Sequence, residues 1–388
     1  MRPDGRPTLG LYIHIPFCVR KCLYCDFYSA KSGKGDEKRY IEALIKHLET
    51  AAPQAESYDV DTVYFGGGTP TLLGAAALGR ILSAVRANYR LTEDAEITTE
   101  CNPVTGSDDL FEGLAAAGFN RVSVGLQSAD DGELKALGRP HDFAAFLATF
   151  RGLSAAGLAN INVDVMFGIP HQTKESFART LAAVIDTGAT HVSAYGLRVE
   201  EGTPFAAMGD LHLPDDDATA DLQLLAAERL TAAGYTHYEI SNYAKPGYAC
   251  RHNLRYWQGS PYLGFGPGAH SCFDGVRFSF PRDTAAYIAA AQKDDFNALV
   301  TGREAVTGKN AQDEYVMLRM RLFEGVNEAD FLTRFGTSFE KAYGPFDRLE
   351  AVGYLCRTGG RTRFTERGMY VSNAILSEWL DFGKGETT

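Results

Sequence analysis

The sequence predicts an α/β protein, built as a partial (β/α)6 barrel with a smaller winged-helix-like domain at its C-terminal end. Its 388 residues suffice for one large α/β domain of roughly 250 residues and a second, smaller domain. Hydrophobic residues make up 45% of the chain, which provides a normal buried core. Over the first 240 residues, short apolar runs alternate with longer helical patterns, which indicates parallel strands joined by right-handed crossovers.

The alternation defines six strand-and-helix units. The strands are expected at Leu11–Ile15, Thr62–Phe65, Glu96–Glu100, Arg121–Gly125, Asn162–Phe167 and His191–Leu197. The helices are expected at residues 37–51, 75–88, 108–117, 142–156, 175–187 and 217–233. A closed barrel needs eight units, so six favour a partial barrel, and a doubly wound open sheet is the alternative.

The composition changes after the sixth unit, which divides the chain into three parts. We assign residues 1–240 to the barrel, 241–300 to a connecting segment and 301–388 to the C-terminal domain. Residues 241–272 are rich in Gly, Pro, Tyr and Asn and lack a clear helical period. A loop that long inside a compact chain is usually functional.

The C-terminal part carries a pattern typical of winged-helix domains. Three helices, a hairpin that turns at Gly359–Gly360 and a last helix are expected at Tyr315–Phe323, Glu328–Phe335, Phe339–Val352, Tyr354–Phe364 and Glu366–Leu380. Winged helices often bind DNA, and four arginines cluster near the hairpin: Arg357, Arg361, Arg363 and Arg367. Acidic residues nevertheless outnumber basic ones from residue 313 onward, so no nucleic-acid partner is expected.

The charge and hydropathy of the whole chain favour a soluble, cytoplasmic protein. Its 49 acidic and 38 basic residues give a net charge of −11, which disfavours binding to a phosphate backbone. No apolar stretch approaches the roughly 18 residues that a membrane-spanning helix needs. Contact with a membrane is therefore expected to be peripheral at most.

The strongest chemical signal is a group of three cysteines, Cys18, Cys22 and Cys25, directly after the first expected strand. Three thiolates on one loop can each bind one iron of a cubane cluster, which leaves the fourth iron open. A zinc site with a distant fourth ligand such as His14 is the alternative, although such sites usually have a second cysteine pair downstream. The other four cysteines are expected to be thiols without a role: Cys101, Cys250, Cys272 and Cys356.

Two further signals lie at the ends of expected strands. The run Gly66–Thr69 lets the backbone approach a ligand closely, although a plain tight turn would explain it equally well. Polar side chains end successive strands at Glu100, Gln127 and Asp164, and Arg139 follows in a loop. Since the carboxyl ends of barrel strands form the active-site rim, these side chains are candidates for binding a ligand with ribose, amino and carboxylate groups.

The cysteine spacing after a strand resembles the radical S-adenosylmethionine (SAM) superfamily. The resemblance implies a [4Fe–4S] cluster held by Cys18, Cys22 and Cys25, whose open iron is chelated by the amino and carboxylate groups of SAM. Reduction of such a cluster cleaves SAM to methionine and a 5′-deoxyadenosyl radical. The glycine run is similar to the superfamily motif that contacts the methionine part of SAM.

A closer resemblance covers nearly the whole chain. The runs Tyr12–Cys18, Gly66–Thr71, Gly125–Gln127 and Asp164–Pro170 resemble oxygen-independent coproporphyrinogen III dehydrogenase and its relatives. By that resemblance, SAM is bound by Tyr12, Gly67, Gly68, Thr69, Glu100, Gln127, Arg139 and Asp164. Tyr24 is implied as a contact for a second SAM, if one binds.

Two features distinguish the chain from the dehydrogenase itself and are similar to its heme-chaperone branch, the HemW proteins. Phe27 stands where the dehydrogenase has a further cysteine, and His252–Trp257 reproduces the His-Asn-x-x-Tyr-Trp motif of that branch. Histidine can ligate heme iron, and the aromatic side chains offer flat faces to a macrocycle, so His252 is a candidate heme contact.

The resemblance therefore implies a heme chaperone that carries a [4Fe–4S] cluster and SAM. It would take up heme and pass it to an apo-protein, with a membrane respiratory enzyme as one candidate recipient. The first alternative is an enzyme that converts coproporphyrinogen III to protoporphyrinogen IX, and the second is a radical SAM enzyme with another substrate. No catalytic residue is assigned beyond these cofactor ligands.

Overall fold

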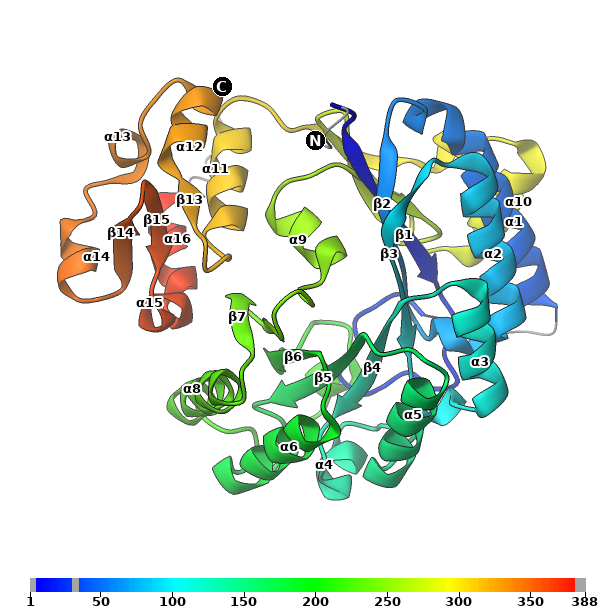
Figure 1. Ribbon diagram of the computed structural model, residues 1–388, viewed down its shortest axis with the longest axis horizontal. Coiled ribbons are helices and arrows are strands. Elements are labelled where there is room, and N and C mark those ends of the chain that lie inside the picture. Colours follow the sequence, from blue (N-terminus) through cyan, green and yellow to red (C-terminus); the bar gives the residue numbers. More distant parts are fainter. Residues whose placement is uncertain (1–4, 30–34, 381–388) are drawn as a thin grey trace.

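The computed structural model describes residues 5–29 and 35–380. Its largest part is a sheet whose first six strands are parallel and neighbour one another in chain order (Figure 1). They are β1 (Thr8–Ile15), β2 (Asp59–Gly67), β3 (Leu91–Cys101), β4 (Arg121–Gln127), β5 (Ile161–Phe167) and β6 (His191–Gly196). All six predicted strands are confirmed, and the parallel pairing follows from the crossover helices between them.

The helices of the six units lie on the outer side of this sheet (Figure 1). They are α1 (Asp36–Ala51), α2 (Gly74–Asn88), α3 (Asp108–Ala117), α5 (Phe143–Ala155), α6 (Lys174–Thr187) and α8 (Asp216–Ala232). Strands in chain order with their helices on one side form a partial barrel, so the doubly wound alternative is wrong. Two short helices, α4 (Asp131–Ala136) and α7 (Pro204–Ala207), were not predicted, because helices this short do not show a helical period in the sequence.

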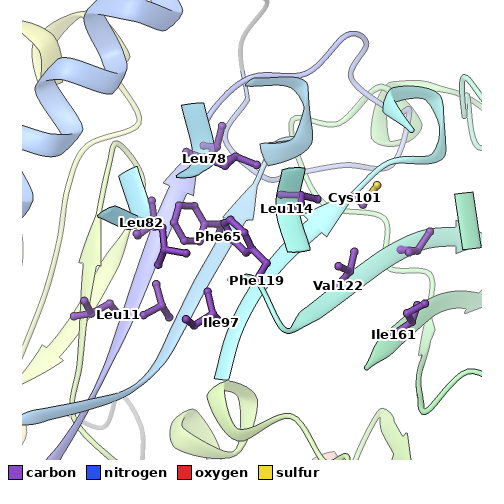
Figure 2. Close-up of a cluster of buried hydrophobic side chains, with 14 of the residues drawn as sticks. Leu11, Phe65, Leu78, Leu82, Ile97, Cys101, Leu114, Phe119, Val122 and Ile161 are labelled. Carbon is purple, nitrogen blue, oxygen red and sulfur yellow. The ribbon is translucent and has the colours of Figure 1, made fainter. Parts of the chain in front are cut away.

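The two faces of the sheet differ in polarity because strand side chains alternate. The outward face is apolar and packs against α2 and α3 in a continuous core (Figure 2) that includes Leu11, Phe65, Leu82, Ile97 and Val122. The inward face carries Tyr64, Glu100, Arg121, Asp164 and Ser193, among others. A barrel interior is normally filled with branched apolar side chains, so this polar face marks where a ligand site is to be sought.

The segment after the sixth unit is ordered rather than irregular, so that part of the prediction is wrong. The antiparallel strands β7 (Thr236–Glu239) and β8 (Asn242–Ala244) follow β6 in the sheet. The other edge is extended from β1 by β9 (Tyr262–Phe265), β10 (His270–Phe273), β11 (Val276–Ser279) and β12 (Thr301–Ala305), with α10 (Thr284–Lys293) between the last two. The helix α9 (Arg251–Trp257) lies on the inner side of the sheet, and its seven residues are too few to show a helical period.

The C-terminal part has its own hydrophobic core, built around Phe331, Phe339, Phe346 and Phe364. Its elements are α11 (Gly308–Arg319), β13 (Val326–Asn327), α12 (Glu328–Phe335), α13 (Phe339–Tyr343), α14 (Asp347–Ala351), β14 (Leu355–Thr358), β15 (Arg361–Phe364), α15 (Glu366–Tyr370) and α16 (Ser372–Trp379). Helices around a small antiparallel sheet fit the winged-helix-like prediction. The predicted helix over Phe339–Val352 is two helices, because Pro345 interrupts it.

Two of the hairpin arginines are engaged within this domain. Arg357 pairs with Glu340 and Glu350, and Arg361 lies 3.8 Å from Glu324.

The proposed boundaries at residues 240 and 300 stay predictions. Within the described ranges, no helix combines the length and apolarity that a bilayer crossing requires.

Candidate functional site

The cysteine loop begins where β1 ends and is held by the glycine run that ends β2. The backbone N–H of Gly68 donates to the carbonyl of Ile15 (2.8 Å), and that of Thr69 donates to Phe17 (2.7 Å). A Cβ atom at position 68 would lie 2.5 Å from the Phe17 carbonyl oxygen, so only glycine permits this approach. The glycine run therefore fixes the start of the loop that carries the three cysteines.

The three cysteines line one cavity of about 150 Å³ at the carboxyl ends of the strands. Eight of the predicted SAM and ligand residues line the same cavity: Tyr24, Gly67, Gly68, Thr69, Glu100, Gln127, Arg139 and Asp164. The sequence placed these residues on separate loops, and the fold brings them together. Tyr12 and His252 do not line this cavity.

The donor chemistry around the cysteines suits an iron–sulfur cluster. The Sγ atom of Cys22 lies 3.5 Å from Arg139 Nη1, and that of Cys18 lies 3.6 Å from Thr69 Oγ1. Burial, together with the neighbouring Cys22 and Cys18, raises the pKa of the Cys25 thiol to about 11 in the metal-free chain. Such thiols become thiolates when iron binds, and the Arg139 cation and Thr69 hydroxyl favour that charged form. Cys18, Cys22 and Cys25 would hold the cluster, which when bound supplies electrons to SAM.

Two carboxylates face the cavity from β3 and β5. Glu100 accepts hydrogen bonds from Tyr64 Oη (3.1 Å) and from the backbone N–H of Gly67 (3.0 Å). Burial and the nearby Asp164 raise the pKa of Glu100 to about 7. Burial also raises the pKa of Asp164, although a hydrogen bond from Asn162 Nδ2 (2.7 Å) opposes that shift. Burial suppresses the ionisation of both carboxyl groups. A ligand amino group or hydroxyl that donates to them would stabilise their ionised form, so the pair is suited to binding such groups.

Opposite these carboxylates, Arg139 and Gln127 supply donors. Arg139 Nη2 donates to the carbonyl of Gly125 (2.6 Å), while its buried Nε has no partner among the described residues. Gln127 accepts from Tyr195 Oη (2.8 Å) and has a positive φ of 77°, at an irregularity in the β4–β5 pairing. A non-glycine residue in that conformation is uncommon and is frequently found at functional sites.

His14, the fourth ligand in the zinc alternative, has both ring nitrogens engaged elsewhere. Its Nε2 lies 2.9 Å from the carbonyl oxygen of Tyr28, and its Nδ1 lies 3.1 Å from Tyr12 Oη. Tyr12 thus faces the barrel interior near His14 and Tyr64 rather than the cysteine cavity. Its predicted contact with SAM stays a prediction.

His252 lies deeper in the barrel, on α9, and is 1% exposed. Its Nδ1 lies 2.9 Å from Thr62 Oγ1, its Nε2 lies 2.8 Å from Tyr256 Oη, and its ring stacks on Tyr64 with a centroid separation of 5.2 Å. Burial lowers the pKa of His252 to about 3, so the ring is neutral. Neutral imidazole is the form that binds metals, but iron ligation requires one of these two hydrogen bonds to break.

A larger cavity of about 680 Å³ overlaps the cysteine cavity and reaches α9, although His252 itself does not line it. At one end it shares Tyr24 and Cys25 with the cysteine cavity, and at the other it reaches Asn253 on α9. Its volume lies within the usual range for small-molecule sites. Arg121, which also lines it, was not identified from the sequence, although the alternation along β4 places it on the same face as Ser123.

Comparison with known proteins identifies the family. The family profile of the radical SAM superfamily matches residues 12–184, and that of the HemN C-terminal domain matches residues 306–371. The chain is 37% identical to the heme chaperone HemW of Escherichia coli, over 96% of this chain and 98% of that protein. The chain belongs to the HemW family. The HemW proteins of Mycobacterium tuberculosis (37% identity, 97% of this chain and 95% of that protein) and Bacillus subtilis (31%, 95% and 98%) are similar over their full lengths as well.

Among solved structures, the chain is similar to coproporphyrinogen III oxidase (HemN) from E. coli, which is described as a radical SAM enzyme. The TM-score is 0.85, with 23% sequence identity, over 97% of this chain and 91% of that structure. At that identity the likeness establishes the fold alone. The HemW family thus shares the radical SAM α/β fold and the C-terminal domain with HemN.

Proposed function

We propose that this protein is a heme chaperone that binds heme in the larger cavity and transfers it to an acceptor apo-protein. Membership of the HemW family carries the proposal, because curated relatives of nearly the same length are named heme chaperones. The cavity supports it, since one space of about 680 Å³ runs from the cysteine loop to the helix that bears the His-Asn-x-x-Tyr-Trp motif.

In this proposal the cofactors occupy the neighbouring small cavity. Cys18, Cys22 and Cys25 hold a [4Fe–4S] cluster, and the remaining lining residues bind SAM beside it. All seven cysteines are free thiols, which suits a reducing compartment such as the cytoplasm. The acceptor would be an apo-protein that needs heme, such as a respiratory enzyme met at the membrane surface.

His252 is proposed as the heme-iron ligand, reached when α9 shifts and its hydrogen bond with either Thr62 or Tyr256 is exchanged for iron. Cys250, two residues earlier at the N-cap of α9 and fully buried, is the other candidate on this segment. Iron would replace the hydrogen bond of one ring nitrogen, while the other nitrogen keeps its partner.

The test is a heme titration of the purified, cluster-loaded protein, followed by absorbance. About one heme per chain is expected, and His252→Ala should weaken binding or change the spectrum. An unchanged spectrum in His252→Ala with loss in Cys250→Ala would move the ligand to Cys250. Absence of heme binding, combined with anaerobic formation of protoporphyrinogen from coproporphyrinogen, would replace the chaperone by the dehydrogenase.

A further inference from the structure

Arg121 is a buried cation that lines the larger cavity and makes no hydrogen bond or salt bridge within the described residues. The side chain is 1% exposed and is among the largest fully buried side chains of the protein. Its Nε has no hydrogen-bond acceptor among the described residues, and its guanidinium forms no ion pair there. A buried guanidinium that lines a cavity with unused hydrogen-bond donors is suited to binding an anionic group of a ligand.

The neighbouring carboxylate is already committed to another task. Glu96 accepts from the backbone N–H groups of Arg251 (2.9 Å) and His252 (3.0 Å) and from Cys250 Sγ (3.5 Å). Glu96 therefore caps the N-terminus of α9 and does not form a salt bridge with Arg121. Burial by itself would lower the pKa of Arg121, but Cys250 and Glu96 nearby raise it, so the side chain stays charged.

Arg121 shares the lining of the cavity with Asn253 on α9. The Asn162 amide, which also lines it, already donates to Ser123 and Asp164. Arg121 is therefore the side chain here whose charge favours an anion. Glu100 and Asp164 line both cavities, and the charge of Arg121 opposes the rise in the pKa of Asp164. A ligand carboxylate at Arg121 would therefore lie beside Asp164.

Part of the lining is apolar and aromatic. Tyr24, Phe27, Met166 and Tyr195 line the cavity, beside polar residues that include Arg198, Glu200 and Arg282. A ligand matched to this arrangement has a flat apolar body and a carboxylate at one edge. Planar guanidinium groups bind carboxylates through two parallel hydrogen bonds, which fixes orientation as well as affinity.

We propose that Arg121 binds a propionate carboxylate of heme and so orients the macrocycle in the cavity. This inference rests on the proposed heme-chaperone function. The propionate edge would lie at Arg121, and the macrocycle would lie against the aromatic side chains. The cavity thereby distinguishes heme from flat ligands of similar size that lack a carboxylate.

The experiment compares heme with iron protoporphyrin IX dimethyl ester, in which both propionates are esterified, using the cluster-loaded protein. Wild-type protein should bind heme at least about tenfold more tightly than the ester. Arg121→Gln should bind heme only as tightly as the ester, and Arg121→Lys should keep part of the difference. Arg198→Gln is the matched control, because Arg198 lines the same cavity but is exposed and pairs with Glu200.

Arg121→Gln should remain folded by circular dichroism but lose some stability in thermal unfolding, since it removes a cation beside Glu96 and Asp164. Equal affinity of wild-type protein for heme and ester would overturn the inference without needing any variant. An equal loss of affinity for both ligands in Arg121→Gln would also overturn it, by showing a purely structural role. Binding of neither ligand by wild-type protein would reject the proposed function itself.

Discussion

Glu96 and Glu100 lie on the same strand, β3, four residues apart and on the same inward face, yet they have different surroundings. Glu96 has both oxygens occupied by donors from α9. Glu100 faces the cofactor cavity and has only Tyr64 and Gly67 as partners. Residue type and sheet face are therefore the same for a ligand-binding and a structural carboxylate. The two differ in how many of their oxygens already accept hydrogen bonds from the protein.

The same contrast holds for the two ends of the barrel interior. At the cysteine end, cationic, thiol and carboxyl groups surround an open cavity. At the α9 end, His252 is hydrogen-bonded on both nitrogens, and Arg255 pairs with Asp61. Substitutions at the first end should therefore remove ligands and leave the fold intact, whereas those at the second end should cost stability.

The largest effect is expected for the cluster ligands. Alanine at Cys18, Cys22 or Cys25 should each reduce the iron of anaerobically reconstituted protein from about four per chain to near zero, because a three-thiolate site cannot lose one. Iron and sulfide analysis measures this, with circular dichroism as a check on folding. Cys356→Ala is the control, since Cys356 lies on β14 in the C-terminal part, whereas Cys101 lines the cysteine cavity. Zinc in place of iron would contradict the cluster assignment.

A loss of stability is expected when the cap of α9 is removed. Glu96→Ala leaves two buried backbone N–H groups without an acceptor and should lower the free energy of unfolding by about 2–4 kcal/mol. Urea unfolding of the metal-free protein measures the change. Glu93→Ala, at an exposed position on the same strand, should stay within about 0.5 kcal/mol of wild type. Equal effects of the two variants would remove the structural role given to Glu96.

These contrasts show what the sequence could and could not predict. The six strands were predictable because apolar residues fill most outward positions. The cysteine and glycine motifs lie at strand ends, where the fold must bring them together. The helix α9 was missed because seven residues show no period, and its position is set by Glu96, a contact across more than 150 residues. Arg121 was missed for a similar reason, since its lack of a partner is a property of the folded interior.

Replacing Glu100, unlike replacing Glu96, is expected to raise the free energy of unfolding at alkaline pH. Its pKa is raised from 4.5 to about 7 in the folded chain, so the folded state holds a proton that the unfolded state has lost between these values. Stability therefore falls as pH rises from about 4.5 to 7, by about 3 kcal/mol at most. Glu100→Gln keeps a neutral group and should be more stable than wild type at pH 8 but not at pH 4.5, while SAM binding weakens. Urea unfolding of the metal-free protein at both pH values measures the difference, and a difference that does not change with pH would refute the shift.

The smallest effect on stability is expected at Phe27, which is 69% exposed and lines both cavities. Phe27→Ala removes little buried area, so the free energy of unfolding should stay within about 0.5 kcal/mol of wild type. Phe17→Ala, on the same segment but 2% exposed, should cost about 3–5 kcal/mol because it leaves a cavity in the core. An exposed aromatic ring at the mouth of a ligand cavity contributes to binding rather than to folding, so Phe27→Ala should weaken heme affinity several-fold in the absorbance titration. If heme affinity is unchanged while stability falls as in Phe17→Ala, then Phe27 belongs to the packed interior and not to the heme site.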